Sequence, residues 1–383
     1  PTQEGSASAA AEALPCSAPS DAPGVADGEI VVGTAQSLSG PVPGLGASNL
    51  AAIQAHVAYR NANGGVCGRQ VVLRSADDGG DNARNRAIIS ELGPQVAAFI
   101  AGTAGGADGG AGAVAEQQLP VVGASISPGL EEVPTYYGVN PPLPSYDAVV
   151  GKYRFLHEQG VRKAAVVWIS AAASPQQAKR EMQLMRAAGI QVVSEQALPL
   201  STLSYDSAAR QIANSGADYM LFLHADGPSA SMAQAIADTG YQGLKFEEYI
   251  IAYGSKFPDL AGTAAEGASS WLYALPAEDG GAVPEQAAYL EWMAQTAPDA
   301  ALDSLAAQGW ASAKLLFDSL EALPGPIARD ALLAQLAATG TYDAGGLLGP
   351  IDIGAQQSQN CVIGMIYEGG GWRRLAPPEG FLC

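Results

Sequence analysis

The fold of this chain is decided by residues 29–81, EIVVGTAQSLSGPVPGLGASNLAAIQAHVAYRNANGGVCGRQVVLRSADDGGD. The stretch begins with the β-branched run of residues 30–32 and continues through a loop rich in Ser, Gly and Pro. A segment that predicts an amphipathic helix opens near Ala47, and a Gly-Gly turn then leads into the run VVL and an acidic turn. This order of strand, loop, helix and strand predicts one unit of a parallel α/β sheet.

The first loop of this stretch, TAQSLSGPVPGLG, is a candidate ligand site. It follows the carboxyl end of a predicted strand, where the loops of parallel α/β sheets form the ligand crevice. Ser37, Ser39 and the loop N–H groups can donate hydrogen bonds, and the helix beginning near Ala47 directs the positive end of its dipole toward them. The loop therefore favours an anionic ligand. An ordinary strand-to-helix turn without a ligand is an alternative of equal weight.

The composition indicates a folded chain of two domains. Its 383 residues suffice for two full cores, and no run reaches the roughly 18 apolar residues of a membrane-spanning helix. With 38 acidic and 19 basic residues, the formal net charge is −19. This charge repels nucleic acid and anionic membranes, so we expect no nucleic-acid partner.

The N-terminal residues 1–27 are rich in Ala, Ser and Pro and lack hydrophobic periodicity, so they predict a disordered tether. The chain begins without Met, and the tether resembles the spacer that follows a removed secretion or lipid-anchor signal. The residue before Cys16 is not the small residue of a lipoprotein signal, so we do not interpret Cys16 as an anchor.

The four cysteines favour disulfides over a metal or redox site, because they include no C-x-x-C pair. Cys16 and Cys67 lie near the first helix and its preceding tail, and Cys361 and Cys383 lie in the last segment. We predict the pairs Cys16–Cys67 and Cys361–Cys383 in an oxidising compartment, although four cysteines allow three pairings. Free thiols in a cytosolic protein are the alternative.

The motifs of residues 29–81 resemble those of one receptor family. SLSGP followed by GLG, then AYRNANGGVCGR, a V-V-L strand and SADDGGD occur in this order in type I periplasmic binding proteins, the receptors of ABC transporters for branched-chain amino acids. The resemblance extends from Gly28 to the end of the chain. It implies an α/β fold of two doubly wound, Rossmann-like lobes joined by a three-strand hinge. Lobe 1 would comprise residues 28–141 and 276–345, and lobe 2 residues 142–275 and 346–383.

The pattern beyond residue 81 agrees with this architecture. A Pro-rich segment at residues 136–146 precedes a new series of helices and short apolar strands that ends near residue 252, as expected of a second parallel sheet. SWLYAL, at residues 270–275, returns to lobe 1 and precedes helices at residues 284–296 and 302–323. A last crossing at residues 342–352 leads into a hairpin with a Gly-Gly-Gly turn.

Loops at other strand ends supply the remaining candidate binding residues. Thr103 and Ala104 follow the third strand, where the family offers hydroxyl and N–H groups to a ligand carboxylate, and Ser125 and Ser127 follow the fourth. Serine before proline is also a common helix cap. Three candidates, Tyr205, His224 and Tyr253, belong to lobe 2. Tyr205 matches a family position, and His224 follows an apolar strand. The predicted ligand-binding set is Ser39, Leu45, Thr103, Ala104, Ser125, Ser127, Tyr205, His224 and Tyr253.

Three positions depart from the family pattern. Leu45 replaces the aromatic residue of the first loop, Ser174 and Pro175 replace a Tyr-Gly pair, and the acid that pairs with a ligand ammonium is replaced near Tyr253. The carboxylate-binding half of an amino-acid site thus resembles the family, while the amine-binding half does not. A buried ammonium without a partner is costly, so an amino-acid site would need another acid. Asp226 is a candidate for that acid, although it lies at a different position from the one in the family pattern.

These observations predict an extracytoplasmic receptor of an ABC importer rather than an enzyme. It would bind a small carboxylate-bearing ligand, such as a branched-chain or other hydrophobic amino acid or an aromatic acid, by hinge closure. We expect no cofactor and no metal, an ABC permease as partner, and a monomer. A sensor domain is the alternative. An NAD-dependent enzyme is less favoured, because Asp77 and Asp78 end the second strand but Ser39 and Pro41 stand where the fingerprint glycines belong.

Overall fold

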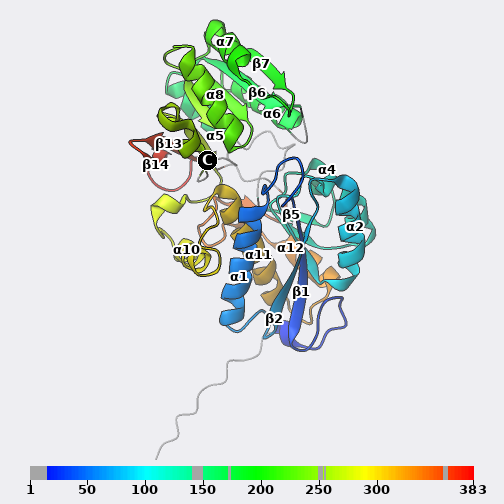
Figure 1. The fold of residues 1–383 in the computed structure, drawn as a ribbon. Coiled ribbons are helices and arrows are strands. Elements are labelled where there is room, and N and C mark those ends of the chain that lie inside the picture. The colour runs from blue at the N-terminus through cyan, green and yellow to red at the C-terminus, as the bar shows by residue number, and fades with distance from the viewer. Residues whose placement is uncertain (1–14, 140–149, 171–173, 249–252, 254–255, 357–360) are drawn as a thin grey trace, which may run out of the picture.

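The computed structural model describes residues 15–139, 150–170, 174–248, 253, 256–356 and 361–383. These residues form two lobes, each built around one sheet, which lie one above the other in Figure 1. Both sheets have parallel strands at their centre, and in each the chain forms its second strand beside the first and then continues on the other side. The α/β architecture expected from the sequence is confirmed.

The first sheet has the order β2-β1-β3-β4-β5 and is parallel throughout. Its strands are β1 (Glu29–Gln36), β2 (Gln70–Asp77), β3 (Ala98–Ala101), β4 (Val121–Gly123) and β5 (Tyr136–Gly138). The helices between them are α1 (Ala47–Ala62), α2 (Asn82–Leu92), α3 (Ala107–Glu116) and α4 (Pro128–Glu131).

Strand β1 is buried on both faces, which explains its continuous apolar run. Ile30 and Val32 pack into the core beside α1, while Val31 packs into the core beside α2 and α3 on the other face. Two loops approach closely at its carboxyl end: a Cβ on Gly40 would lie 1.9 Å from the carbonyl oxygen of Gly79. The first loop can therefore approach the acidic turn this closely only because residue 40 is glycine.

The second sheet has the order β14-β13-β10-β9-β8-β6-β7, with β13 and β14 antiparallel to their neighbours. Its strands are β6 (Lys163–Ile169), β7 (Gln191–Leu198), β8 (Tyr219–Leu223), β9 (Lys245–Glu248), β10 (Ser269–Leu272), β13 (Ile363–Glu368) and β14 (Gly371–Ala376). Its helices are α5 (Val150–Glu158), α6 (Ser174–Ala187), α7 (Asp206–Ser215), α8 (Asp226–Asp238) and α9 (Phe257–Ala261). The C-terminal hairpin predicted from the glycine run is confirmed as β13 and β14.

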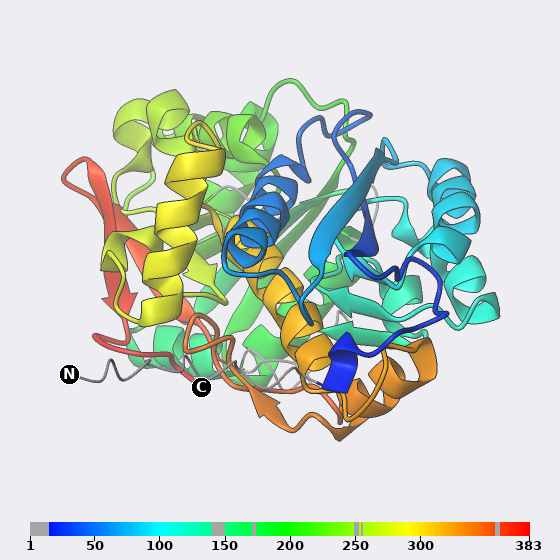
Figure 2. The ribbon, with the colours of Figure 1, turned by 90° about the horizontal axis from the view of Figure 1, so that it is seen from below.

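The chain returns to the first lobe after β10. Three helices follow, α10 (Pro284–Thr296), α11 (Ser304–Glu321) and α12 (Arg329–Ala338), and then a short ladder of β11 (Thr341–Tyr342) with β12 (Ile351–Asp352). Figure 2 shows α11 beside α1. On α11, the fully buried Trp310 lies 4.6 Å from the ring of His56, measured between ring centroids. The buried His56 is therefore a core residue of the first lobe.

The N-terminal segment from Pro15 onward is fixed to the first lobe. The disulfide Cys16–Cys67 joins it to the turn before β2, and the guanidinium of Arg69 donates to the carbonyl oxygens of Cys16, Ser17 and Ala18. The prediction of a free tether over residues 1–27 is therefore wrong for residues 15–27, and residues 1–14 lie outside the described part. Hydrophobic periodicity could not reveal that this segment is ordered, because the disulfide and the hydrogen bonds of Arg69 hold it in place rather than an apolar helix or strand face.

The second predicted disulfide, Cys361–Cys383, is also present, so both pairings are confirmed. It fastens Cys383 to the residues just before β13. Among the described helices, none combines the length and the apolar character that crossing a bilayer requires. The predicted lobe boundaries stay predictions. Leu347 and Leu348, which the prediction assigns to lobe 2, pack into the core cluster that contains α11.

Candidate functional site

A pocket of ≈ 540 Å³ lies where the carboxyl ends of the first-sheet strands face the second lobe. Loops after β1, β2, β3 and β4 form one side, and Ile169 and Leu200 of the second lobe contribute from the other. Its lining residues are Ser37, Ser39, Pro41, Val42, Leu45, Gly80, Asp81, Asn82, Gly105, Asp108, Ile126, Ser127, Pro128, Ile169 and Leu200. A larger hollow of ≈ 680 Å³ lies between residues 19–23 and 326–333, away from the strand ends.

One buried carboxylate, that of Asp78, fixes the loops of the pocket wall. Its Oδ1 accepts from the hydroxyl of Ser37 at 2.6 Å and from the N–H of Gly80 at 2.8 Å. Its Oδ2 accepts from the side-chain amide of Asn85 at 3.0 Å and from the N–H of Gly106 at 3.1 Å. Four donors compensate the buried charge, and they come from three loops and one helix. Asp78 therefore sets the relative positions of these loops.

The neighbouring Asp77 takes the donors of the first loop. The hydroxyl of Ser39 donates to Asp77 Oδ2 at 2.5 Å, and the N–H groups of Leu38 and Ser39 donate to Oδ1. The Ser39 hydrogen bond is the largest cause that lowers the pKa of Asp77 below its usual range. Donors expected to bind a ligand anion thus bind the chain's own carboxylates. The same contacts leave Asp77 and Asp78 poorly placed to hold a ribose, as an NAD site would require.

Ser127, the residue immediately before α4, also donates inward. Its hydroxyl donates to Asp108 Oδ1 at 2.8 Å, and its N–H donates to the hydroxyl oxygen of Ser125 at 3.0 Å. The N–H of Gly129 donates to the same Asp108 oxygen. A hydroxyl that has donated its one proton still has lone pairs for a further donor. In this conformation, Ser37, Ser39 and Ser127 therefore offer the pocket acceptors rather than donors.

Thr103 and Ala104 lie behind the pocket wall rather than in its lining. The N–H of Thr103 donates to Gln36 Oε1 at 2.9 Å, and Gln36 Nε2 donates to Asn49 Oδ1 at 2.9 Å. Asn49 Nδ2 in turn donates to the carbonyl oxygen of Leu305 at the start of α11. This chain of buried amides ties the third loop to α1 and α11.

The three lobe 2 candidates also lie outside the lining of this pocket. Tyr205 is buried against Phe222, with 5.6 Å between the ring centroids. His224 Nδ1 accepts from the N–H of Ala225 at 2.8 Å, and burial lowers the pKa of His224 to about 4, so the ring is neutral at pH 7. Tyr253 is buried in the core.

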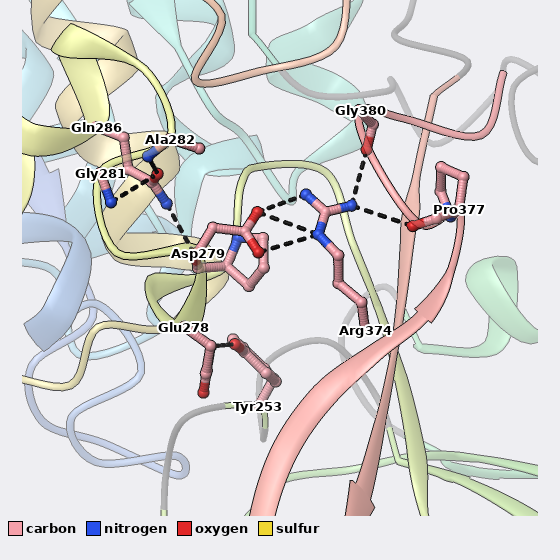
Figure 3. A network of polar contacts seen from close by, with 10 residues as sticks. Tyr253, Glu278, Asp279, Gly281, Ala282, Gln286, Arg374, Pro377 and Gly380 are labelled. Atoms are coloured by element: carbon pink, nitrogen blue, oxygen red, sulfur yellow. Dashed lines mark hydrogen bonds and ion pairs between the residues drawn. The ribbon is translucent and has the colours of Figure 1, made fainter.

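Tyr253 belongs to a polar network at the crossing between the lobes (Figure 3). Its hydroxyl donates to Glu278. Beside it, Arg374 of β14 donates to both carboxylate oxygens of Asp279 and to the carbonyl oxygens of Pro377 and Gly380. The network joins the C-terminal hairpin to the segment that leads from β10 to α10, which gives Tyr253 a contact at the hinge.

The structure thus brings Ser39, Leu45 and Ser127 together in the pocket lining, and it places Thr103, Ala104, Ser125, Tyr205, His224 and Tyr253 outside that lining. Sequence reasoning missed Asp81, Asp108, Ile126, Ile169 and Leu200. Two signals were available: the acidic turn after β2, and the acid within the glycine-rich loop after β3. Nothing in the sequence singled out the apolar residues contributed by lobe 2.

Two α/β lobes with a pocket at the carboxyl ends of their strands define a class of receptors that hold a small solute between domains. A comparison with family models gives the family: the model described as periplasmic binding protein matches residues 29–366, so this chain belongs to that family. Its members are extracytoplasmic solute-binding receptors of the ABC-transporter type rather than enzymes. The resemblance stated from the sequence is confirmed. No curated protein sequence matches the chain.

Solved structures share the fold at low sequence identity. A fatty acid ABC transporter substrate-binding protein from Thermomonospora curvata has a TM-score of 0.78 and 20% identity, with 94% of each chain covered. A Rhodopseudomonas palustris solute-binding protein in complex with 4-hydroxybenzoate has a TM-score of 0.76 and 19% identity, covering 91% of this chain and 96% of that one. A possible leucine/isoleucine/valine-binding protein from Rhodopirellula baltica has a TM-score of 0.78 and 15% identity, with coverages of 91% and 96%.

Proposed function

We propose that this chain binds one small carboxylate-bearing solute between its lobes and delivers it to the permease of an ABC importer. The observation that carries the proposal is the pocket of ≈ 540 Å³, to which both lobes contribute. That volume lies in the range typical of small-molecule sites, about 300 to 1,000 Å³. A hydrophobic amino acid or an aromatic acid suits it.

The apolar part of the solute would lie against residues from both lobes. Pro41, Val42 and Leu45 of the first loop face this space together with Ile169 and Leu200 of the second lobe. Burying apolar surface contributes roughly 25 cal/mol per Å². These side chains therefore favour a branched or aromatic body over a sugar.

The carboxylate would be held by hydroxyl groups of lobe 1. Ser39 is exposed, so its hydroxyl can turn from Asp77 toward a solute, and Ser127 lies in the same lining. Thr103 and Ser125 would join them after a small movement of their loops. The similar structures support a carboxylate in general, since a fatty acid and 4-hydroxybenzoate both carry one.

The mechanism is closure about the hinge. A solute that touches both lobes binds the closed form more tightly than the open form, and this difference in affinity shifts the population toward closure. The closed form then docks on the permease. We expect the receptor to act as a monomer outside the cytoplasm.

A thermal-shift screen tests this function. The standard amino acids, aromatic acids and short fatty acids are added in turn, and a true solute raises the melting temperature because it binds only the folded form. Leu200→Asp should abolish the shift. Leu203→Asp, at an almost fully exposed position outside the lining, is the matched control and should retain it. No stabilising compound, or equal binding by both variants, would contradict the proposal.

A further inference from the structure

A polar contact joins the two lobes outside the solute pocket (Figure 3). Arg374 belongs to β14 of the second sheet, and Asp279 ends the short 3₁₀ helix η5 (Ala277–Asp279), which precedes α10. Arg374 Nε donates to the two Asp279 oxygens at 3.0 and 3.1 Å, and a terminal nitrogen of the guanidinium donates to Asp279 Oδ2 at 2.5 Å. Neither residue is among the described residues that line the pocket, so this contact can be changed without altering the pocket wall.

Asp279 is fixed to lobe 1 by the side chain of Gln286 on α10. Gln286 Oε1 accepts from the N–H groups of Gly281 and Ala282 at 3.2 and 2.7 Å. Gln286 Nε2 donates to the carbonyl oxygen of Pro276 at 2.7 Å. These bonds fasten the chain on both sides of Asp279 to α10, and α10 packs against α1. Asp279 therefore moves with lobe 1.

Arg374 is fixed to lobe 2 by the C-terminal tail. Its other terminal nitrogen donates to the carbonyl oxygens of Pro377 and Gly380 at 3.3 and 2.9 Å. The disulfide Cys361–Cys383 fastens this tail to the residues just before β13. The guanidinium is therefore held in place from its own lobe and moves with the hairpin.

A second contact between the lobes lies beside the first. The ring of Tyr253 lies 5.3 Å from the ring of Trp372 on β14, measured between centroids, and the Tyr253 hydroxyl donates to Glu278. Burial and the Glu278 carboxylate raise the pKa of Tyr253, so the hydroxyl keeps the proton that it donates. Two donors of lobe 2 thus meet two adjacent acids of lobe 1, and the four residues Tyr253, Glu278, Asp279 and Arg374 form an interlobe latch.

Burial distinguishes Arg374 from its neighbour Arg373. The side chains of Arg374 and Asp279 are each 16% exposed, whereas Arg373 pairs with Glu368 inside the hairpin at exposures of 58% and 37%. Exposed ion pairs contribute little because water screens them, but removing one partner of a largely buried pair leaves a charge without compensation. The two arginines are adjacent on β14, and only Arg374 joins the lobes, so they form a matched comparison.

We propose that the interlobe latch holds the lobes in the arrangement in which both line the solute pocket, and that it thereby sets the affinity for the solute. Ile169 and Leu200 of lobe 2 line the pocket in the same structure in which the latch is intact. Breaking the latch therefore favours arrangements in which the lobes lie further apart. The apparent affinity falls with the fraction of the protein in the binding-competent arrangement. This inference rests on the proposed function and adds positioning residues that do not touch the solute.

Small-angle X-ray scattering of the solute-free protein gives the first test. Arg374→Gln should have a larger radius of gyration than the wild type, whereas Arg373→Gln should have an unchanged one. Asp279→Asn breaks the same ion pair but leaves Arg374 its contacts with the tail, so it should behave like Arg374→Gln. Equal radii for Arg374→Gln and Arg373→Gln would overturn the inference.

Affinity gives the second test. The wild type and the variants are titrated by calorimetry with leucine, or with benzoate if the thermal-shift screen selects aromatic acids. Arg374→Gln and Asp279→Asn should each weaken binding by up to about 10-fold, as for loss of one hydrogen bond to a charged group. The double variant should bind no more weakly than either single variant, because both changes break one contact. Arg373→Gln should change the affinity by less than about twofold.

The comparison also separates positioning from a purely structural role. A structural role alone would lower the urea midpoint of Arg374→Gln while leaving its affinity equal to that of Arg373→Gln, and this result would overturn the inference. Tighter binding by Arg374→Gln would also overturn it, because the latch would then hold the lobes apart. If the wild type bound neither compound, the proposed function would be contradicted, and the scattering of the solute-free variants would still decide the inference.

Discussion

The contacts of Asp78 predict that one conservative substitution loosens the whole wall of the pocket. In Asp78→Asn the side chain keeps its shape but has a single acceptor oxygen. The N–H of Gly80 donates to one carboxylate oxygen and the N–H of Gly106 to the other. Whichever way the new amide turns, one of these backbone donors faces an NH₂ group. Ser37 and Asn85 can adjust by rotation, but the backbone donors cannot.

The expected cost follows from the one hydrogen bond that is lost. A hydrogen bond to a charged group contributes about 1.5 to 3 kcal/mol, so Asp78→Asn should lower the free energy of unfolding by about that amount. Asp78→Ala should cost more, because all four donors lose their acceptor. Urea unfolding followed by tryptophan fluorescence measures both changes through the shift in midpoint.

The neighbouring acid supplies the control. Asp77 lies in the same turn and accepts from Ser39, but this contact is exposed to solvent. Asp77→Asn should therefore shift the midpoint much less than Asp78→Asn. The assignment of Asp78 as the residue that fixes the loops would be wrong in either of two cases. The free energy of unfolding of Asp78→Asn could lie within about 0.5 kcal/mol of the wild-type value, or Asp77→Asn could lower it by as much as Asp78→Asn does.

Three further predictions concern other parts of the fold. Replacing Cys16 and Cys67 by serine opens a loop closed across a separation of 51 residues and should lower the free energy of unfolding by about 4 kcal/mol, measured by urea denaturation. Burial raises the pKa of Asp303, the N-cap residue of α11, from 3.8 to about 6, so the folded state holds this proton more tightly and stability should fall by up to about 3 kcal/mol as the pH rises from about 4 to about 6. Asp303→Asn keeps the cap and should remove this pH dependence in denaturation curves at pH 4 and pH 7. Arg374→Gln leaves the half-buried Asp279 without its cation and should cost about 1.5 to 3 kcal/mol in the same assay, whereas an unchanged midpoint would show that the crossing does not need this pair.

The fold was predictable because local signals agreed along the whole chain. Strand β1 is apolar on both faces and ends in a glycine-rich loop, and α1 begins at Ala47 as expected. The helix expected at residues 302–323 forms α11, and its residues Leu316, Phe317 and Leu320 are buried in the core. Helix α12 was not predicted, because the expected path of the chain between the helix at residues 302–323 and the last crossing at residues 342–352 did not call for another helix.

The site was only partly predictable, because its chemistry depends on contacts between distant residues. The serines of the first loop were identified as donors from their residue type. Their actual acceptors, Asp77 and Asp78, lie about 40 residues further along the chain, and no local pattern indicated that pairing. The pocket residues of lobe 2 were missed for a similar reason, since Ile169 and Leu200 carry no polar group and become part of a site only through the approach of the two lobes.

The most direct test of the account is small-angle X-ray scattering of the protein with and without a solute found in the thermal-shift screen. Closure of the two lobes over that solute predicts a smaller radius of gyration in its presence, and Leu200→Asp should show no change when the same compound is added. A solute that binds tightly and leaves the radius of gyration unchanged would contradict the claim that this chain works by closing its lobes around its ligand.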